Sequence, residues 1–221
     1  DTLEFREITY SRDGDIVTME QGEDYAVTES GTEATWKSYT YDIYEDNFTE
    51  EGIYAVTIYS EDRATNRSSN TVKEKEIQFV MDTTLPTIVV TGVEDQEQYN
   101  SDRRSVTIDA KDNIYLSEVV AYVDNVPVKT FSEEELTAAN GVVTLEIGSS
   151  NDWQTLTVKA IDAAGNEGYS DTRVFLITRN VLVQWYQNRP LFWGSLAGLA
   201  VGAGVIFMIV SKRKKRNDET A

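Results

Sequence analysis

Residues 156–166 read Leu-Thr-Val-Lys-Ala-Ile-Asp-Ala-Ala-Gly-Asn, which joins a strand pattern to a turn pattern. Apolar and polar side chains alternate through the first half, as in a half-buried β-strand. Asp162 and Asn166 have short side chains that bind nearby backbone N–H groups, and Gly165 between them tolerates positive φ. The segment therefore predicts a strand closed by a tight turn, and this role fits the acid and the amide better than a ligand site does.

The same pattern stands 100 residues earlier, in residues 56–66, where Asp62 and Asn66 take the places of the acid and the amide. A second match, at an offset of 111, relates residues 7–17 to residues 118–128. Two matches in chain order argue for two copies of one domain. The alignment also leaves the opening of the second copy without a counterpart, so we expect the first two strands of the first copy to lie upstream of this chain.

Alternating runs dominate up to about residue 178, and no amphipathic helix of useful length is expected before that point. The pair Asp124-Asn125 between two such runs favours a tight hairpin. About seven short strands in about 95 residues are typical of an immunoglobulin-like β-sandwich. The predicted strands of the second copy are residues 105–110, 118–123, 126–131, 143–147, 156–160 and 174–176.

An uncharged apolar run extends from Leu191 to Val210. Twenty helical residues span about 30 Å, which is the thickness of the hydrocarbon core of a bilayer. Trp193 lies near its amino-terminal edge, where aromatic rings favour the headgroup zone. The run predicts one membrane-spanning helix whose partner is the lipid bilayer.

A basic cluster that begins with Lys212 and Arg213 follows the run. The positive-inside rule then places the C-terminus in the cytoplasm and residues 1–189 outside, as a single-pass protein of the cell membrane. Within the span, small residues at Gly194, Gly198 and Gly202 share one helix face, which allows self-association by close helix approach.

The fold expectation is thus all-β, with tandem immunoglobulin-like β-sandwiches followed by one transmembrane α-helix. The expected division is residues 1–83 and 84–180 for the two sandwiches, 181–190 for a juxtamembrane linker, 191–211 for the transmembrane helix and 212–221 for a basic cytoplasmic tail.

The 221 residues include 38 acidic and 20 basic side chains, for a net charge of −18, and contain neither Cys nor His. Disulfides, thiol chemistry, Cys/His metal sites and His-dependent catalysis are therefore excluded. A nucleic-acid partner is not expected because the folded part is strongly acidic. No catalytic residues and no organic cofactor are expected in this chain.

Calcium is the one metal that the residues suggest, since it takes oxygen ligands from acidic loops. Asp82, Asp109 and Asp112 are the candidate ligands, near the expected interdomain end. With so many carboxylates in the chain, however, a merely solvated acidic surface is the interpretation that the sequence favours.

Three segments carry a family resemblance. They are Thr84-Leu-Pro-Thr-Ile88, residues 112–128 with Tyr122-Val-Asp-Asn-Val-Pro-Val128, and the Asp162–Asn166 turn. In this order they resemble the bacterial Ig-like (Big-type) repeat domains of surface proteins, here with a C-terminal membrane anchor. Tyr54 is similar to the tyrosine corner of such sandwiches.

The resemblance implies a bacterial surface protein of the adhesin, extracellular hydrolase or stalk type. We expect a non-catalytic stalk that displays an upstream module. One alternative is an adhesin that binds a host protein or glycan through loops or exposed aromatic rings, and another is the anchor of a hydrolase whose catalytic domain lies upstream. The aromatic candidates for the adhesin are Tyr39, Tyr41, Tyr44, Phe48 and Tyr59. Exposure of these rings favours binding, and burial favours the stalk.

Overall fold

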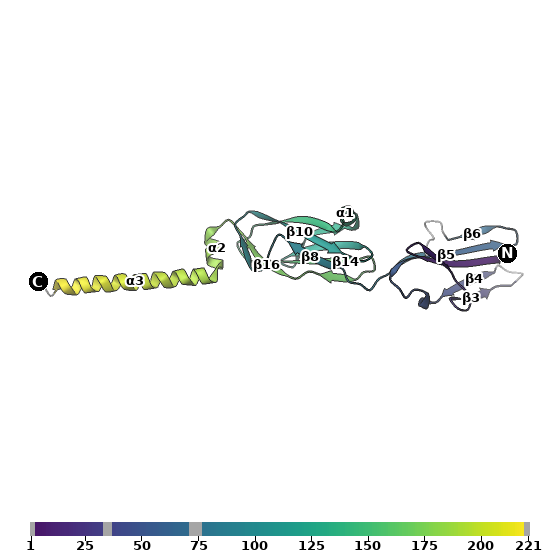
Figure 1. The fold of residues 1–221 in the computed structure, drawn as a ribbon, viewed down its shortest axis with the longest axis horizontal. Coiled ribbons are helices and arrows are strands. Elements are labelled where there is room, and N and C mark those ends of the chain that lie inside the picture. Colours follow the sequence, from purple (N-terminus) through teal and green to yellow (C-terminus); the bar gives the residue numbers. More distant parts are fainter. Residues whose placement is uncertain (1–2, 33–36, 71–76, 219–221) are drawn as a thin grey trace.

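The structure is a computed structural model that describes residues 3–32, 37–70 and 77–218. It is mostly β-structure, followed by two helices at the carboxyl end (Figure 1). A first β-unit, a second β-unit and the long helix α3 follow one another along the longest axis of the molecule. The described chain is therefore a rod.

The second β-unit consists of two sheets that share one core. The first sheet has the order β13-β10-β8, and the second has the order β12-β11-β14-β16-β9 with β15 paired to β14. Alternate residues of both sheets, such as Val106 and Val158, are fully buried between them. The strands are β8 (Thr87–Thr91), β9 (Glu97–Tyr99), β10 (Arg103–Lys111), β11 (Leu116–Val123), β12 (Val126–Ser132), β13 (Val142–Gly148), β14 (Gln154–Asp162), β15 (Glu167–Tyr169) and β16 (Arg173–Ile177).

The strands predicted from alternation are all present, and their ends agree with the prediction or extend beyond it by one or two residues. The hairpin between β11 and β12 turns at Asp124 and Asn125, which have φ angles of 53° and 63°. Both residues thus adopt the positive φ values that a two-residue turn of this type requires.

One short helix that the sequence did not predict lies before residue 178, and it is consistent with the expectation that no amphipathic helix of useful length occurs there. Helix α1 (Glu133–Ala138) follows β12 and buries Leu136. Its amino end is a capping box, in which the Ser132 side chain accepts from the Glu135 backbone while the Glu135 side chain accepts from the Ser132 backbone. Six residues make less than two turns, so the segment is too short to show helical periodicity.

The first β-unit has a smaller core between a larger sheet and a hairpin. The sheet has the order β2-β1-β5-β6 with β7 also paired to β5, and the hairpin is β3-β4. Ile8, Tyr25 and Val56 are buried between them. The elements are β1 (Leu3–Arg12), β2 (Asp15–Thr18), β3 (Tyr25–Ser30), β4 (Ser38–Ile43), the 3-10 helix η1 (Glu45–Asn47), β5 (Gly52–Asp62), β6 (Arg67–Ser69) and β7 (Ile77–Met81).

Tyr54 in β5 is almost fully buried, and its hydroxyl donates to the Glu50 carbonyl at 2.8 Å. This is the backbone-directed bond of a tyrosine corner. In the second unit Gln154 takes the corresponding place and is buried at the start of β14.

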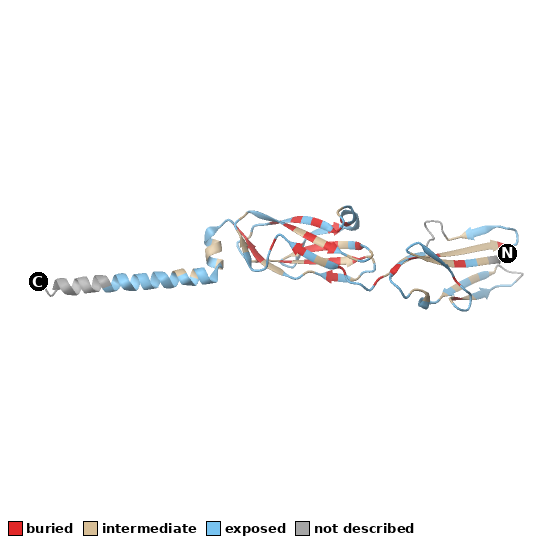
Figure 2. Cartoon of the chain, viewed as in Figure 1, coloured by how far each residue is buried: buried red, intermediate tan, exposed pale blue. Residues whose placement is uncertain are grey.

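The segment 181–190, expected as a juxtamembrane linker, contains a short helix. Helix α2 (Val181–Gln187) is capped by the Asn180 side chain, which accepts from two backbone N–H groups. Helix α3 (Arg189–Asp218) then begins before the apolar run and continues through the basic cluster. Lys and Arg are good helix formers and nothing breaks the pattern, so the helix extends beyond the predicted end. Figure 2 shows the buried residues concentrated in the β-units, and the described side chains of α3 mostly exposed.

Candidate cation site at the junction of the two β-units

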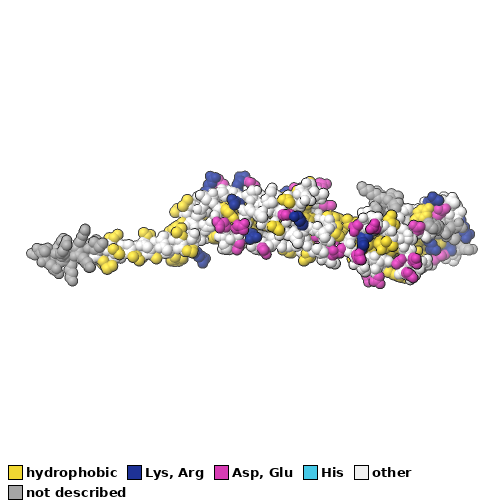
Figure 3. Space-filling model, in the orientation of Figure 1, with side chains coloured by type: hydrophobic (Ala, Val, Ile, Leu, Met, Phe, Trp, Pro, Cys, Tyr) yellow, Lys and Arg dark blue, Asp and Glu magenta, His cyan; other side chains and the backbone are white. Residues whose placement is uncertain are grey.

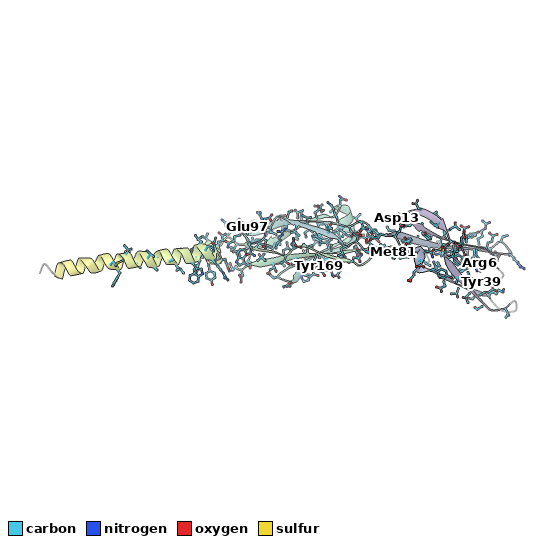
Figure 4. All side chains as sticks on the ribbon, turned by 60° about the horizontal axis from the view of Figure 1, so that its bottom comes forward. Arg6, Asp13, Tyr39, Met81, Glu97 and Tyr169 are labelled. Atoms are coloured by element: carbon cyan, nitrogen blue, oxygen red, sulfur yellow. The ribbon has the colours of Figure 1, made fainter. Side chains whose placement is uncertain are left out.

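Three carboxylates meet where the two β-units join. Asp82 follows the last strand of the first unit, Asp112 follows β10, and Asp162 ends β14. One oxygen of each lies within 4.8 Å of the corresponding oxygens of the other two. Figure 4 labels Met81, the neighbour of Asp82, at this narrow part of the rod.

Asp162 is fixed by its own turn and is 1% exposed. Its Oδ1 accepts from the Ala164 and Asn166 backbone N–H groups at 2.8 and 2.9 Å, and its Oδ2 accepts from the Asn166 side chain at 2.7 Å. Gly165 has a φ of 91°, as the turn requires. The carboxylate is thus held rigidly, with its negative charge buried.

Asp82 and Asp112 are each bonded through one oxygen only. Asp82 Oδ1 accepts from the Thr84 N–H at 2.9 Å, and Asp112 Oδ2 accepts from the Ile114 N–H at 3.0 Å. Asp82 Oδ2 and Asp112 Oδ1 are buried without a hydrogen-bond partner. An unpaired buried carboxylate oxygen is costly, and a cation held between these two atoms would offset that cost.

The electrostatic environment of Asp112 points in the same direction. Burial raises the pKa of Asp112, and the charges of Asp82 and Asp162 raise it further. Like charges this close disfavour each other's ionised form. A bound cation would reverse that balance because it attracts all three.

Polar contacts tie the first unit and its linker to the same place. The Asn166 side chain donates to the Asp82 carbonyl at 2.9 Å. Glu51 accepts from the Thr83 backbone at 3.0 Å and from the Thr83 hydroxyl at 2.7 Å. Glu51 also accepts from the Asn113 side chain at 3.1 Å, so one carboxylate of the first unit holds both the linker and the second unit.

Asp109, the third predicted ligand, lies apart from this cluster. It stands on β10 between the buried residues Ile108 and Ala110, so its side chain leaves the opposite face of the sheet. Its Oδ2 accepts from Lys111 at 3.1 Å. The candidate ligand set in the structure is therefore Asp82, Asp112 and Asp162.

Sequence reasoning placed Asp162 in a turn and missed it as a ligand. The signal that could have found it is the pairing of β11 with β14, in which Leu116 lies opposite Asp162. Because only a short link separates Asp112 from Leu116, that register brings the two acids together. Asp62 makes the same turn bonds in the first unit, to Ala64 and Asn66, but within the described residues it belongs to no cluster of three or more acidic groups.

The chemistry of the cluster suits a hard divalent cation. Calcium takes six to eight oxygen ligands and magnesium six, so the three carboxylates would need water or backbone oxygens to complete the shell. The chain has no Cys or His, which removes the usual ligands of zinc and other softer metals.

The residues expected to anchor the chain lie on α3. The segment Arg189–Met208 has a mean hydropathy of 1.9 and is not buried, so it is long and apolar enough to cross a bilayer. Leu191 and Trp193 are exposed, and Gly194, Gly198 and Gly202 have open space beside them. The helix continues through Val210, Lys212 and Arg213. Figure 3 shows hydrophobic side chains along this helix and acidic ones over the β-units.

No protein-family model matches the chain, and no curated protein matches its sequence. Among solved structures, the chain is similar to fibronectin(III)-like modules of Clostridium thermocellum CbhA, with 11% identity over 78% of this chain and 77% of that chain and a TM-score of 0.37. Murine CEACAM1b gives 13% identity over 77% of this chain and 85% of that chain, with a TM-score of 0.37. A chimeric titin Z1Z2 gives 15% identity over 78% of this chain and 82% of that chain, with a TM-score of 0.32. TM-scores this low do not establish a shared fold, so the architecture rests on the strand topology described above.

Proposed function

We propose that the chain is a non-catalytic, membrane-anchored stalk, in which tandem immunoglobulin-like sandwiches project from the cell surface and α3 crosses the bilayer. The observation that carries the proposal is the axial order of the parts: at one end of an acidic rod lies α3, in which residues 191–208 are apolar, uncharged and unburied (Figure 1). Residues 1–189 would lie outside, and the basic end of α3 in the cytoplasm. Negative charge would keep the rod soluble and away from its neighbours.

The aromatic side chains support a stalk better than an adhesin. Of the five candidate rings, Tyr44 alone is exposed, at 37%. Phe48 packs edge to face on Tyr54 and Phe79, with ring centroids 5.2 and 5.0 Å apart. Tyr39 lies under the Arg6 guanidinium (Figure 4). Tyr41 and Phe48 pack against the core of the first unit, and Tyr39 and Tyr59 are partly buried, which supports burial more than a contiguous exposed surface for a protein or glycan.

The anchor is tested with the full chain reconstituted into phosphatidylcholine vesicles. We expect the protein to float with the vesicles and to resist extraction at alkaline pH. In molecules whose β-units face outward, external protease should remove the β-units and leave a fragment containing residues 191–210 protected. Extraction of the intact chain by alkali would contradict the proposal.

We further propose that the junction binds calcium and that the ion stiffens the stalk. Asp82 is the key residue, since it is 8% exposed and its Oδ2 is unpartnered beside two other carboxylates. The ion would join a residue of the first unit to two residues of the second. It would therefore resist bending between the units, which a spacer requires.

Matched variants distinguish the loss of the cation site from a disturbance of the turn that contains Asp162. Asp162→Asn and Asp62→Asn change equivalent turns, but among the described residues only Asp162 belongs to a cluster of three acidic groups. Titration of the full chain in detergent with CaCl₂, followed by calorimetry, should give a binding isotherm for wild type and Asp62→Asn. Asp162→Asn and Asp112→Asn should lose it.

Stiffening is measured on the same full chain with two spin labels. Because the chain has no Cys, Ile16→Cys and Val128→Cys place one label on each unit. The distribution of distances between the two labels should be narrower in calcium than in the presence of a chelator. Asp162→Asn should abolish this difference. Binding to wild type and to Asp162→Asn alike would overturn the calcium proposal while leaving the anchor untouched.

A further inference from the structure

We propose that α2 lies flat in the headgroup layer of the membrane, with its apolar face in the lipid, and that it fixes the angle at which the second β-unit stands on the bilayer. The inference rests on the proposed function, in which α3 crosses that bilayer. In this proposal, α2, which lies in the segment expected to be a linker, binds lipid directly.

Helix α2 is amphipathic over its short length. At 3.6 residues per turn, Val181, Leu182, Trp185 and Tyr186 fall on one face, and Gln184 and Gln187 fall on the opposite face. Val181, Leu182 and Tyr186 are 68%, 74% and 62% exposed. A soluble linker has no reason to present such a face to water, because each of these side chains would gain free energy from burial.

The polar face of α2 is bound to the second β-unit. The Gln184 amide donates to the Thr178 carbonyl at 2.6 Å. Gln187 accepts from the Trp153 indole N–H and donates to the Asp152 carboxylate, both at 3.2 Å. These bonds orient the helix, so that its apolar face must point away from the β-unit.

The corner between α2 and α3 is also fixed. The Trp185 indole N–H donates to the Ser195 hydroxyl at 3.1 Å, across the corner. The Phe192 ring contacts Trp185 and Tyr186 edge to face, with centroids 4.8 and 5.2 Å apart. The Asn188 side chain at the corner accepts a hydrogen bond from the Leu191 N–H and so caps the first turn of α3. The two helices are therefore joined without a flexible segment.

The direction of α2 indicates that lipid covers its apolar face. Figure 1 shows α2 lying across the long axis, whereas α3 runs along it. With α3 upright in a bilayer, α2 must lie nearly parallel to the membrane surface, beside Trp193 at the edge of the span. Its apolar face is therefore continuous with the lipid-facing surface of α3, and aromatic rings favour this depth.

Charge agrees with this placement. Residues 172–211, which include α2 and its surroundings, contain three basic residues, Arg173, Arg179 and Arg189, and no acidic one, although the chain as a whole has an excess of acids. Helix α2 itself is uncharged and lies between Arg179 and Arg189. Acidic groups are repelled by a lipid surface that carries negative charge, and basic groups are attracted to it. Arg179 also pairs with Asp102 of the β-unit at 3.2 Å.

The test uses single-cysteine variants of the full, otherwise Cys-free chain, each labelled with an environment-sensitive fluorophore. Leu182→Cys and Tyr186→Cys report on the face of α2, and Phe207→Cys reports on the span. Ile16→Cys is the matched control, an exposed aliphatic position in the first β-unit. Phosphatidylcholine vesicles carry a quencher either near the headgroup or deep in the acyl chains.

We expect labels at positions 182 and 186 to show blue-shifted emission and to be quenched most by the shallow probe. The label at position 207 should respond to the deep probe, and the label at position 16 to neither. If positions 182 and 186 behave like position 16 while position 207 is quenched, the inference about α2 is wrong and the stalk stands. If position 207 also stays in water, the membrane anchor itself fails.

Discussion

Thr65 and Gly165 occupy the same place in two equivalent turns, with φ angles of 62° and 91°. A β-branched residue is strained at positive φ, whereas glycine is not. Thr65→Gly should therefore raise the free energy of unfolding of the first unit by up to about 1 kcal/mol. Gly165→Ala should lower that of the second unit by about 1 kcal/mol, since no neighbouring atom crowds the site and the conformational penalty acts alone. Urea unfolding measures both, and a loss of stability in Thr65→Gly would contradict the argument.

Gly168 is required for a different reason, the close approach of the linker. A Cβ at this position would overlap the carbonyl oxygen of Pro86. Gly168→Ala should thus destabilise the second unit by about 1–3 kcal/mol, because either β15 or the linker must move. Gly148→Ala is the control, since a Cβ there meets no atom within 4 Å. Equal thermal shifts in the two variants would show that the contact with Pro86 is unimportant.

At the residue scale, the sequence predicted the turns well, whereas the structure brings together a different set of candidate ligands from the set that the sequence suggested. Asp162 and Asn166 bind backbone groups within a few residues, so the pattern alone suffices to place them. Asp109 and Asp162 were difficult to assign from the sequence. The register between paired strands decides from which face of the sheet an acidic side chain projects and which strand end lies next to it. Register is a property of strand pairs and is not visible in one strand.

Among the elements, α1 depends on its capping box. Ser132→Ala removes the side-chain acceptor for the Glu135 backbone and should lower the free energy of unfolding by about 1 kcal/mol. Thermal unfolding in comparison with Thr130→Ala, in the preceding strand and outside the cap, isolates the effect. A variant as stable as the wild type would mean that burial of Leu136 alone holds the helix.

The same cap gives a pH dependence. The backbone N–H of Ser132, and then Lys129, lower the pKa of Glu135 in the folded state. A lowered folded pKa gives stability that is present above the unfolded pKa, near 4.3, and that is lost as pH falls through the folded value. Glu135→Gln keeps an acceptor but cannot titrate, so its unfolding should depend less on pH between about pH 5 and pH 3. Identical pH profiles for the two proteins would contradict this linkage.

Long strands and the apolar span could be predicted from sequence because their periodicity extends over many residues. The short helices α1 and α2 could not, since each is less than two turns or close to it. Their formation depends on caps and on what they pack against, namely Leu136 in the core and the two glutamines of α2 on the β-unit. Tertiary contacts of this kind decide short elements more than propensity does.

For the whole molecule, the two β-units have separate cores, and polar contacts at the junction connect them. Separate cores imply separate unfolding. Leu156→Ala removes a fully buried side chain of the second unit and should destabilise that unit by about 2–5 kcal/mol. With calcium chelated, the first unit should be unaffected. Fluorophores at Ile16→Cys or Val128→Cys report on each unit in the full chain.

Added calcium should then couple the two transitions, because an ion held by Asp82, Asp112 and Asp162 is lost when either unit unfolds. Under chelation, a shift of both transitions by Leu156→Ala would show that the units already fold as one. Calcium should raise the unfolding midpoint of the first unit in the wild-type chain. The increase should be smaller in the Leu156→Ala chain, because its second unit unfolds first and releases the ion. A first unit indifferent to calcium in both chains would mean that the junction transmits no stability along the rod.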